Sequence, residues 1–129
     1  MSKLKVTLRV DFDSSHSIGP GKIALLEHLR DSGSLSQAAR DLGMSYRRAW
    51  QLLSSLNQSF CEPLVLTAVG GSGGGGSTLT PMGARVIAAY RDFEHDMNTR
   101  AGEYFGTFAQ AAMPVNAGTR RSVRRSAPR

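Results

Sequence analysis

The sequence predicts a mainly α-helical fold with a small β component, on three observations. Apolar and polar residues alternate strictly over residues 3–12, which is the period of a strand with one buried face. Four later segments repeat apolar residues every three to four positions, as amphipathic helices do, and they cover residues 21–32, 35–42, 46–59 and about 81–108. Two short β-type runs flank a glycine-rich segment between the third and fourth of these helices.

The N-terminal strand is expected to bury one row of apolar side chains, namely Leu4, Val6, Leu8, Val10 and Phe12. A turn region follows over residues 13–21 and contains two glycines and a proline. The first helix is expected to begin directly after this turn.

Capping residues separate the first three helices. Gly33 is expected to stop the first helix, and Ser34 with Gln37 fits a capping box that opens the second. Gly43 ends that helix, and Ser45 is expected to cap the third. The buried face of the third helix is expected to consist of Ala49, Leu53, Leu56 and Phe60. Trp50 adjoins this face and is expected in the core, the alternative being a platform on which a base stacks.

Two β-type runs, residues 64–67 and 77–80, are expected to pair as a hairpin with a long, flexible glycine-rich tip. Thr80 and Pro81 then form an N-cap and first-turn signature for a long fourth helix. Later glycines weaken its far end, so fraying beyond about residue 101 is expected. Its apolar positions are spaced almost as in a coiled-coil seam, and they are Val86, Tyr90, Phe93, Met97, Ala101, Tyr104 and Phe108.

The chain is expected to form one domain, residues 1–113, followed by a disordered basic tail, residues 114–129. Sixteen Lys and Arg against ten Asp and Glu give the 129 residues a formal charge of +6. The tail holds five arginines and no acid, and residues 1–59 hold eight bases against five acids. Residues 60–113 hold three bases against five acids. A basic first half and a basic tail favour a polyanionic partner.

The sequence offers no support for several other kinds of site. Cys61 is the only cysteine, so no internal disulfide forms, and its side chain is expected to be buried or half-buried. His16, His28 and His95 lack the spacing of metal ligands, so no metal, cofactor or catalytic residue is predicted and the chain is not expected to be an enzyme. No apolar run reaches the roughly 18 residues of a membrane span, and a cytoplasmic protein is expected.

Two short helices joined by the turn at residues 43–45 predict a helix-turn-helix, whose second helix recognises DNA. The glycine-rich hairpin that follows fits the wing of the winged variant of this motif, because glycine lets backbone approach phosphate closely. Lys22 is expected either to contact phosphate or to be solvated. The complete set of expected DNA contacts is Lys22, Ser36, Gln37, Ser45, Tyr46, Arg47, Arg48, Gln51, Gly73, Gly74, Ser77 and Thr78.

These segments also resemble a known family. The motifs that carry the resemblance are Ile18–Lys22, Gly33–Arg40, Met44–Trp50, Leu56–Asn57, Gly70–Gly76 and Leu79–Thr80 with Gly83. Over residues 18–90 the chain resembles the N-terminal DNA-binding domain of ModE-type molybdate-responsive transcription regulators, which is similar to the LysR-type winged helix-turn-helix. The resemblance implies a recognition helix that begins at Ser45 and a homodimer formed through the long last helix. That dimer interface would include Val86, Tyr90, Phe93, Met97 and Tyr104.

The leading hypothesis is a sequence-specific, dimeric transcriptional regulator that binds a palindromic operator in double-stranded DNA. By analogy with the family, it would control molybdate-transport or molybdenum-enzyme genes. Family members continue into small molybdate-binding domains, whereas this chain is expected to lack its own, and its small-molecule effector is left open. Two alternatives stay open: a winged-helix protein–protein adaptor without specific DNA binding, and an oxyanion-binding protein for molybdate.

Overall fold

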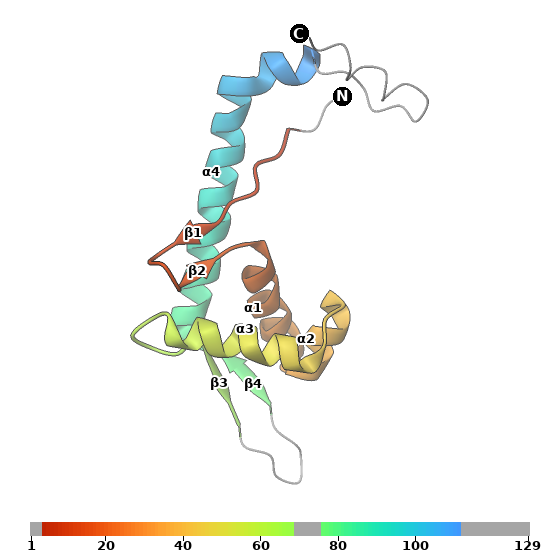
Figure 1. Ribbon diagram of the computed structural model, residues 1–129, viewed down its shortest axis with the longest axis vertical. Helices are drawn as coiled ribbons and strands as arrows, with labels where there is room; N and C mark the ends of the chain where they lie inside the picture. The colour runs from red at the N-terminus through yellow and green to blue at the C-terminus, as the bar shows by residue number, and fades with distance from the viewer. Residues whose placement is uncertain (1–3, 69–75, 112–129) are drawn as a thin grey trace.

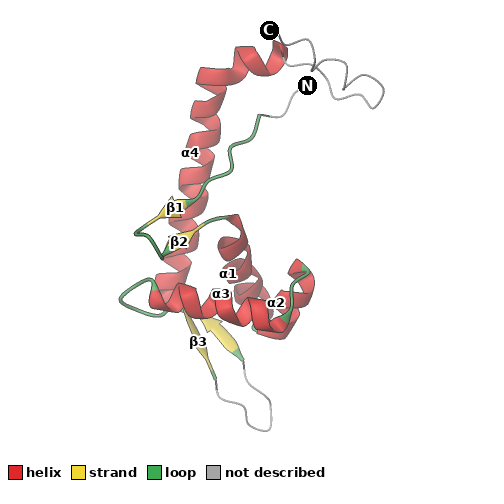
Figure 2. Ribbon diagram, viewed as in Figure 1, coloured by secondary structure: helices red, strands yellow, loops and turns green. Residues whose placement is uncertain are grey.

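The computed structural model describes residues 4–68 and 76–111, and within them the fold is mainly helical (Figures 1 and 2). Its elements are β1 (Val10–Asp11), β2 (Ser17–Ile18), α1 (Pro20–Ser32), α2 (Leu35–Leu42), α3 (Tyr46–Gln58), β3 (Val65–Thr67), β4 (Ser77–Leu79) and α4 (Pro81–Ala111). The strands form two separate antiparallel pairs, β1 with β2 and β3 with β4. The predicted fold class, a winged helix-turn-helix with a long last helix, is confirmed. The predicted tail and the tip of the hairpin lie outside the described residues.

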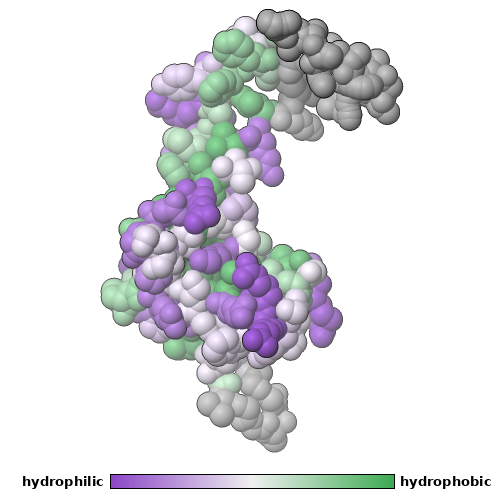
Figure 3. All heavy atoms as spheres, viewed as in Figure 1, coloured by the Kyte–Doolittle hydropathy of each residue, from purple (hydrophilic) through white to green (hydrophobic). Residues whose placement is uncertain are grey.

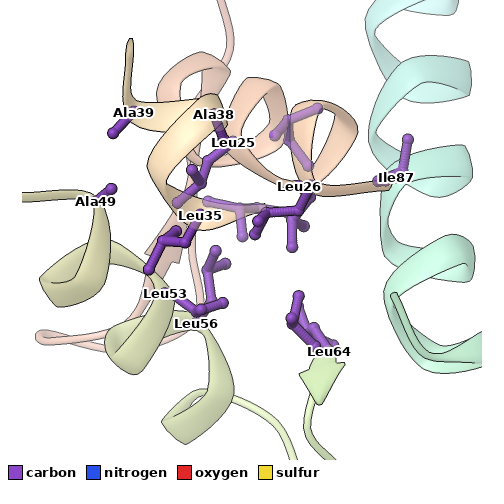
Figure 4. Close-up of a cluster of buried hydrophobic side chains, with 14 of the residues drawn as sticks. Leu25, Leu26, Leu35, Ala38, Ala39, Ala49, Leu53, Leu56, Leu64 and Ile87 are labelled. Carbon is purple, nitrogen blue, oxygen red and sulfur yellow. The ribbon is translucent and has the colours of Figure 1, made fainter. Parts of the chain in front are cut away.

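The first three helices form a compact body with α1 at its centre. In Figure 1 the β3–β4 hairpin projects from one end of this body, and α4 extends away from it in the opposite direction. α1 contacts α2, α3, α4 and β4. Buried leucines and alanines from these elements meet in one core (Figure 4), which includes Leu25, Leu26, Leu35, Ala38, Ala49, Leu53, Leu56, Leu64 and Ile87. Each buried leucine contributes roughly 1.5–3 kcal/mol, so this core holds α3 firmly in place.

Local capping signals define the helix boundaries as the sequence predicts. Gly33 and Gly43 follow α1 and α2 in the left-handed conformation, with φ of 69° and 70°, which glycine adopts without steric cost. The Ser34 Oγ atom accepts a hydrogen bond from the Gln37 amide at 3.1 Å, as an N-cap does. A capping box also requires the Gln37 side chain to accept from the backbone amide of Ser34. This part of the prediction is wrong, because that amide donates to the Ser32 hydroxyl at 3.1 Å.

The predicted N-terminal strand over residues 3–12 is shortened to the two residues of β1. Its alternation is nevertheless real, since Val6, Leu8 and Val10 are half-buried while the residues between them are exposed. The segment lies along α4 and bonds to side chains there. The Val6 amide donates to Asn98 Oδ1 and the Tyr90 hydroxyl donates to the Leu8 carbonyl, both at 2.7 Å. The alternation therefore marks an extended segment that packs one face on a helix. Because a helix has no free backbone groups with which to form a β-ladder, most of this segment is not a strand.

The loop after α3 departs from two further expectations. Cys61 is exposed, although a buried or half-buried thiol was predicted. Phe60 lies beyond the end of α3 and is half-buried, and Phe12 packs edge-to-face on it with the ring centroids 5.3 Å apart. Phe12 itself remains 50% exposed. Both rings cover the rim of the body and do not enter its core.

α4 begins as predicted, because Thr80 Oγ1 accepts from the Gly83 amide at 3.0 Å. The same hydroxyl donates to the carbonyl of Pro63 at 2.8 Å, which ties the start of α4 to the residues just before β3. The predicted fraying beyond residue 101 is wrong, since α4 is helical to Ala111. Figure 1 shows it bending in its C-terminal part, where Gly102 and Gly106 lie in the sequence, and glycine is a common cause of such bends.

Candidate nucleic-acid interface

The surface of α3 divides into three stripes around its buried face. Successive side chains of a helix are separated by about 100° around its axis. Arg47 and Gln51 are exposed and lie opposite the buried alanine and leucines of this helix. Tyr46 and Trp50 lie on the flank that faces the β3–β4 hairpin. Arg48 lies on the opposite flank, close enough to Lys22 of α1 for their charges to interact.

The N-terminal end of α3 is positively charged and open to solvent. Ser45 Oγ accepts from the Arg48 amide at 3.0 Å, which caps the helix as predicted. α3 contains no acidic residue. Within residues 4–68 and 76–111, neither Arg47 nor Arg48 pairs with a carboxylate. Because free amides and the helix dipole add to these charges, this end of α3 attracts anions.

Lys22 has a structural position that the sequence did not indicate. Its Nζ atom donates to the Ser17 carbonyl at 2.9 Å and to Ser55 Oγ at 3.4 Å, so it links β2 and α1 to α3. Burial lowers the pKa of this ammonium, and the charges of Arg9 and Arg48 lower it further. Lys22 is therefore not freely solvated, and its predicted contact with a phosphate stays a prediction.

Asn57 holds the hairpin against α3, and the sequence analysis assigned it no role. Its Oδ1 atom accepts from the amides of Leu64 and Val65 at 2.8 and 3.2 Å, and its Nδ2 atom donates to the Val65 carbonyl at 3.0 Å. These three bonds fix where β3 starts relative to α3. The sequence offered one signal for this role of Asn57: it is a polar residue near the end of an amphipathic helix, just before a hairpin.

A groove of about 350 Å³ separates α3 from the hairpin. Its lining residues are Ser34, Leu35, Ser36, Tyr46, Trp50, Leu53, Thr67, Ala68, Gly76 and Ser77. Ser77 is only 8% exposed and its amide donates to the Gly33 carbonyl at 2.9 Å, so it anchors the hairpin and offers little surface for a contact. Thr78 is exposed, as a contact requires. Gly73 and Gly74 lie outside the described residues.

The two contacts expected from α2 differ in availability. Ser36 is exposed at the edge of the groove. Gln37 is half-buried, and its amide group is occupied within the helix: Nε2 donates to Asp41 at 2.8 Å and Oε1 accepts from Arg40 at 2.8 Å. One N–H of Nε2 and one lone pair of Oε1 remain for a contact with DNA.

Comparison with known proteins agrees with this geometry. Residues 21–84 match the model of the bacterial regulatory helix-turn-helix proteins of the lysR family. These residues form a ModE-type, LysR-like helix-turn-helix domain. The match runs from the start of α1 to the start of α4, so it contains the helix-turn-helix and the hairpin.

Three relatives of this ModE-type domain illustrate the similarity. The DNA-binding transcriptional dual regulator ModE of Escherichia coli K12 is 48% identical over 71 residues, which are 55% of this chain and 27% of that protein. The molybdenum-pterin-binding protein MopB of Rhodobacter capsulatus is 43% identical over 77 residues, 60% of this chain and 28% of the other. The molybdenum transport protein ModE of Azotobacter vinelandii is 37% identical over 87 residues, which are 67% of this chain and 32% of that protein. The matched region thus covers less than a third of each relative.

Trp50 of the ModE-type domain is 54% exposed, although its place beside the apolar face of α3 predicted a core position. Tyr46, one turn earlier, is 55% exposed. With Arg47 and Gln51, these two aromatic residues line a shallow hollow of about 550 Å³ on the outer surface of α3. The core position at this level of the helix is filled by Ala49, which leaves the indole on the surface.

The predicted dimer seam on α4 is split between two environments. Tyr90 is 2% exposed within the single chain, so its side chain is covered by residues of the same chain. Val86 packs partly against the same core. Phe93 and Tyr104 are 41% and 67% exposed, and Met97 is half-buried. A wide groove of about 900 Å³ lies between the N-terminal segment and this distal half, lined by Val6, Leu8, His95, Asp96, Met97, Thr99, Arg100, Ala101 and Tyr104.

The described residues hold neither a cluster of metal-ligating side chains nor a membrane-spanning helix. Nowhere in residues 4–68 and 76–111 do three or more His, Cys, Asp or Glu side chains gather as metal ligands would. His16 Nδ1 is hydrogen-bonded to Asp13 at 2.9 Å, and His28 Nδ1 donates to the Ala24 carbonyl at 2.9 Å. The helices in the described part of the chain are too short or too polar to cross a membrane.

Proposed function

We propose that this ModE-type domain makes the chain a sequence-specific DNA-binding regulator that acts as a homodimer. The observation that carries the proposal is the solvent-facing surface of α3, where Arg47, Arg48 and Gln51 are exposed on a helix that has no acidic residue and is anchored by a leucine core. Arginine can bond guanine and glutamine can bond adenine through paired hydrogen bonds in the major groove. The helix cap and dipole favour a phosphate beside them.

The neighbouring elements support the same placement of DNA. Ser36 at the start of α2 is exposed at the edge of the groove next to α3, and Thr78 is exposed on β4 of the hairpin, outside that groove. Small hydroxyl side chains suit contacts to the sugar–phosphate backbone, which position a protein on the duplex. The hairpin, tied to α3 by Asn57, would follow that backbone away from the bases.

The distal half of α4 is the proposed site of dimerisation. Its exposed aromatic residues are Phe93, Tyr104, Phe105 and Phe108. Contiguous exposed aromatic surface of this kind marks interaction sites in soluble proteins, and Figure 3 shows hydrophobic residues gathered along this part of the molecule. A second copy would cover it with the same surface, giving a twofold dimer. Such a dimer would bind an inverted repeat whose half-sites are about 10 base pairs apart, or a multiple of that spacing.

The names of the relatives suggest which genes are regulated. They are called molybdenum transport and molybdenum-pterin-binding proteins as well as transcriptional regulators. We infer that this chain controls genes for molybdenum uptake or use. Immunoprecipitation of the protein with its bound genomic fragments would name those genes, and fragments unrelated to molybdenum would refute this part of the proposal.

The central test is the double variant Arg47→Ala with Arg48→Ala, measured on a genomic fragment that the unaltered protein binds. Loss of two phosphate or base contacts is expected to weaken specific binding by at least tenfold and to flatten the dependence of affinity on salt. Arg85→Ala removes an exposed arginine from the first half of α4, outside the proposed dimer surface, and serves as control. Unchanged specific affinity in the first, correctly folded variant would contradict the assignment. Weak, sequence-independent binding by the unaltered protein would favour a protein–protein adaptor.

A further inference from the structure

The hollow on α3 combines exposed aromatic rings with hydrogen-bond donors. Tyr46 and Trp50 present aromatic surface that is more than half exposed, and Arg47 and Gln51 beside them carry hydrogen-bond donors. The two aromatic residues are four positions apart, so their rings stand on one side of the helix. None of the four belongs to the hydrophobic core.

A ligand for this hollow must offer both an apolar group and hydrogen-bond acceptors. The major groove of DNA presents acceptors at every base pair, but its only apolar group is a methyl on carbon 5 of a pyrimidine, which thymine always carries. The indole and phenol rings would bury such a methyl, while the neighbouring arginine and glutamine bonded the adjacent base edges. An apolar protein surface would satisfy the rings but leave the guanidinium group without an acceptor.

We propose that Tyr46 and Trp50 form a binding site for the 5-methyl group of a thymine, and that this contact makes the protein select thymine at a defined position of its operator. The inference rests on the proposed function, because it requires α3 to lie in the major groove. 5-Methylcytosine carries the same group, so the shared chemistry is a pyrimidine 5-methyl and the experiment must separate the two sources.

The first probe is a duplex enriched by the unaltered protein from a random-sequence library. Replacing the contacted dT by dU removes only the methyl group. Burial of one such carbon is worth roughly 0.8 kcal/mol, so the affinity should fall about fourfold for one methyl and about fifteenfold for two symmetry-related ones. Equal affinity for the dT and dU duplexes at every position would overturn the inference.

Variants of α3 assign the effect to the aromatic residues. Trp50→Ala should bind the dT duplex more weakly, by a similar factor, and should no longer distinguish dT from dU. Gln58→Ala changes another exposed residue of α3 outside the hollow and should retain the full difference. If Trp50→Ala distinguishes dT from dU as well as the unaltered protein does, Trp50 does not contact the methyl group.

A third pair of duplexes separates thymine from 5-methylcytosine. With the contacted T·A pair changed to C·G, affinity should fall, and a methyl on that cytosine should restore part of it. Tighter binding of the methylated C·G duplex than of the T·A duplex would overturn thymine as the selected base.

Fluorescence gives a readout that needs no variant, because Trp50 is the only tryptophan of the chain. Binding of the dT duplex should shift its emission to shorter wavelength and protect it from quenching by acrylamide, and the dU duplex should do so less. Unchanged emission on saturation with the dT duplex would refute the contact. Enrichment of no duplex at all would refute the proposed function, whereas an enriched duplex that is insensitive to dU refutes this inference alone.

Discussion

The two halves of α4 carry one apolar repeat but use it in different ways. In the first half, Ile87 and Tyr90 are 6% and 2% exposed because α1 and the N-terminal segment cover them. In the second half, Tyr104 and Phe108 are 67% and 68% exposed. The comparison teaches that a helical repeat states which face is apolar, while the partner of that face depends on what the rest of the chain places opposite it.

Polar contacts reinforce the same division. The Arg91 guanidinium donates two hydrogen bonds to Glu27 of α1, at 2.8 and 2.9 Å, and a third to Glu94 at 2.7 Å. The Tyr90 hydroxyl bonds the Leu8 carbonyl beside them. Beyond Asn98, the described side chains of α4 form no further hydrogen bond to another element. The first half is thus part of the domain, whereas the described side chains of the second half beyond Asn98 form no such bonds to it.

The largest effect is expected from Ile87→Ala in the buried half. Loss of a buried isoleucine should reduce the free energy of unfolding by about 2–5 kcal/mol. Phe108→Ala in the exposed half is the matched control and should change chain stability by no more than about 0.5 kcal/mol. Urea unfolding at several protein concentrations separates chain stability from dimer dissociation, because only the latter depends on concentration. Similar losses in both variants would abolish the distinction between the halves.

A smaller, opposite-signed pair of effects is expected from two glycines of α4. A Cβ at Gly83 would collide with the Leu64 carbonyl and the Leu79 side chain, so Gly83→Ala should destabilise the domain by about 1–3 kcal/mol. Nothing lies near a Cβ at Gly102, so Gly102→Ala should stabilise the helix by up to about 1 kcal/mol. Thermal unfolding of both variants measures the pair, and a stabilising Gly83→Ala would show that the hairpin does not press on α4.

Tyr90→Phe tests the single hydrogen bond that the buried half of α4 donates to the Leu8 carbonyl. Removing the hydroxyl should cost about 1 kcal/mol and should speed hydrogen exchange of the Val6 amide, because the N-terminal segment loses one of its ties to α4. Tyr104→Phe in the exposed half should leave both measurements unchanged. Equal exchange of the Val6 amide in the two variants would contradict this role.

The smallest expected effect is a pH dependence from Glu27. The hydrogen bonds from Arg91 lower the pKa of this carboxyl below its usual 4.5. Its contribution to stability is therefore complete above that value and is lost as the pH falls through the lowered, folded-state pKa. Because Arg91 is 40% exposed, solvent screening should keep the loss under about 1 kcal/mol. Glu27→Gln should remove this acid-side slope in thermal unfolding from pH 7 to pH 3, whereas Asp92→Asn, exposed on α4, should not.

Elements set by local chemistry were predictable from the sequence. Ser45 and Thr80 accept bonds from amides three residues on, and Gly33 takes a left-handed conformation that other residues avoid. Each signal acts within one turn of helix, so helix boundaries such as Leu35–Leu42 agree with the expected ranges. The outward arginines of α3 were predictable for the same reason, since the apolar period fixes the opposite face.

Residues whose surroundings depend on distant neighbours could not be placed from the sequence. Trp50 lies beside the buried face of α3, but the hairpin leaves it at a groove, and Lys22 finds acceptors on β2 and α3 that no sequence spacing reveals. Tyr90 fits a dimer seam by period, yet the N-terminal segment reaches it first.

The helices, their caps and the polarity of each face could be predicted because they follow from interactions between residues a few positions apart. Which apolar faces become buried could not be predicted, because burial depends on segments such as residues 6–8 and 90–98 that meet across most of the chain's length.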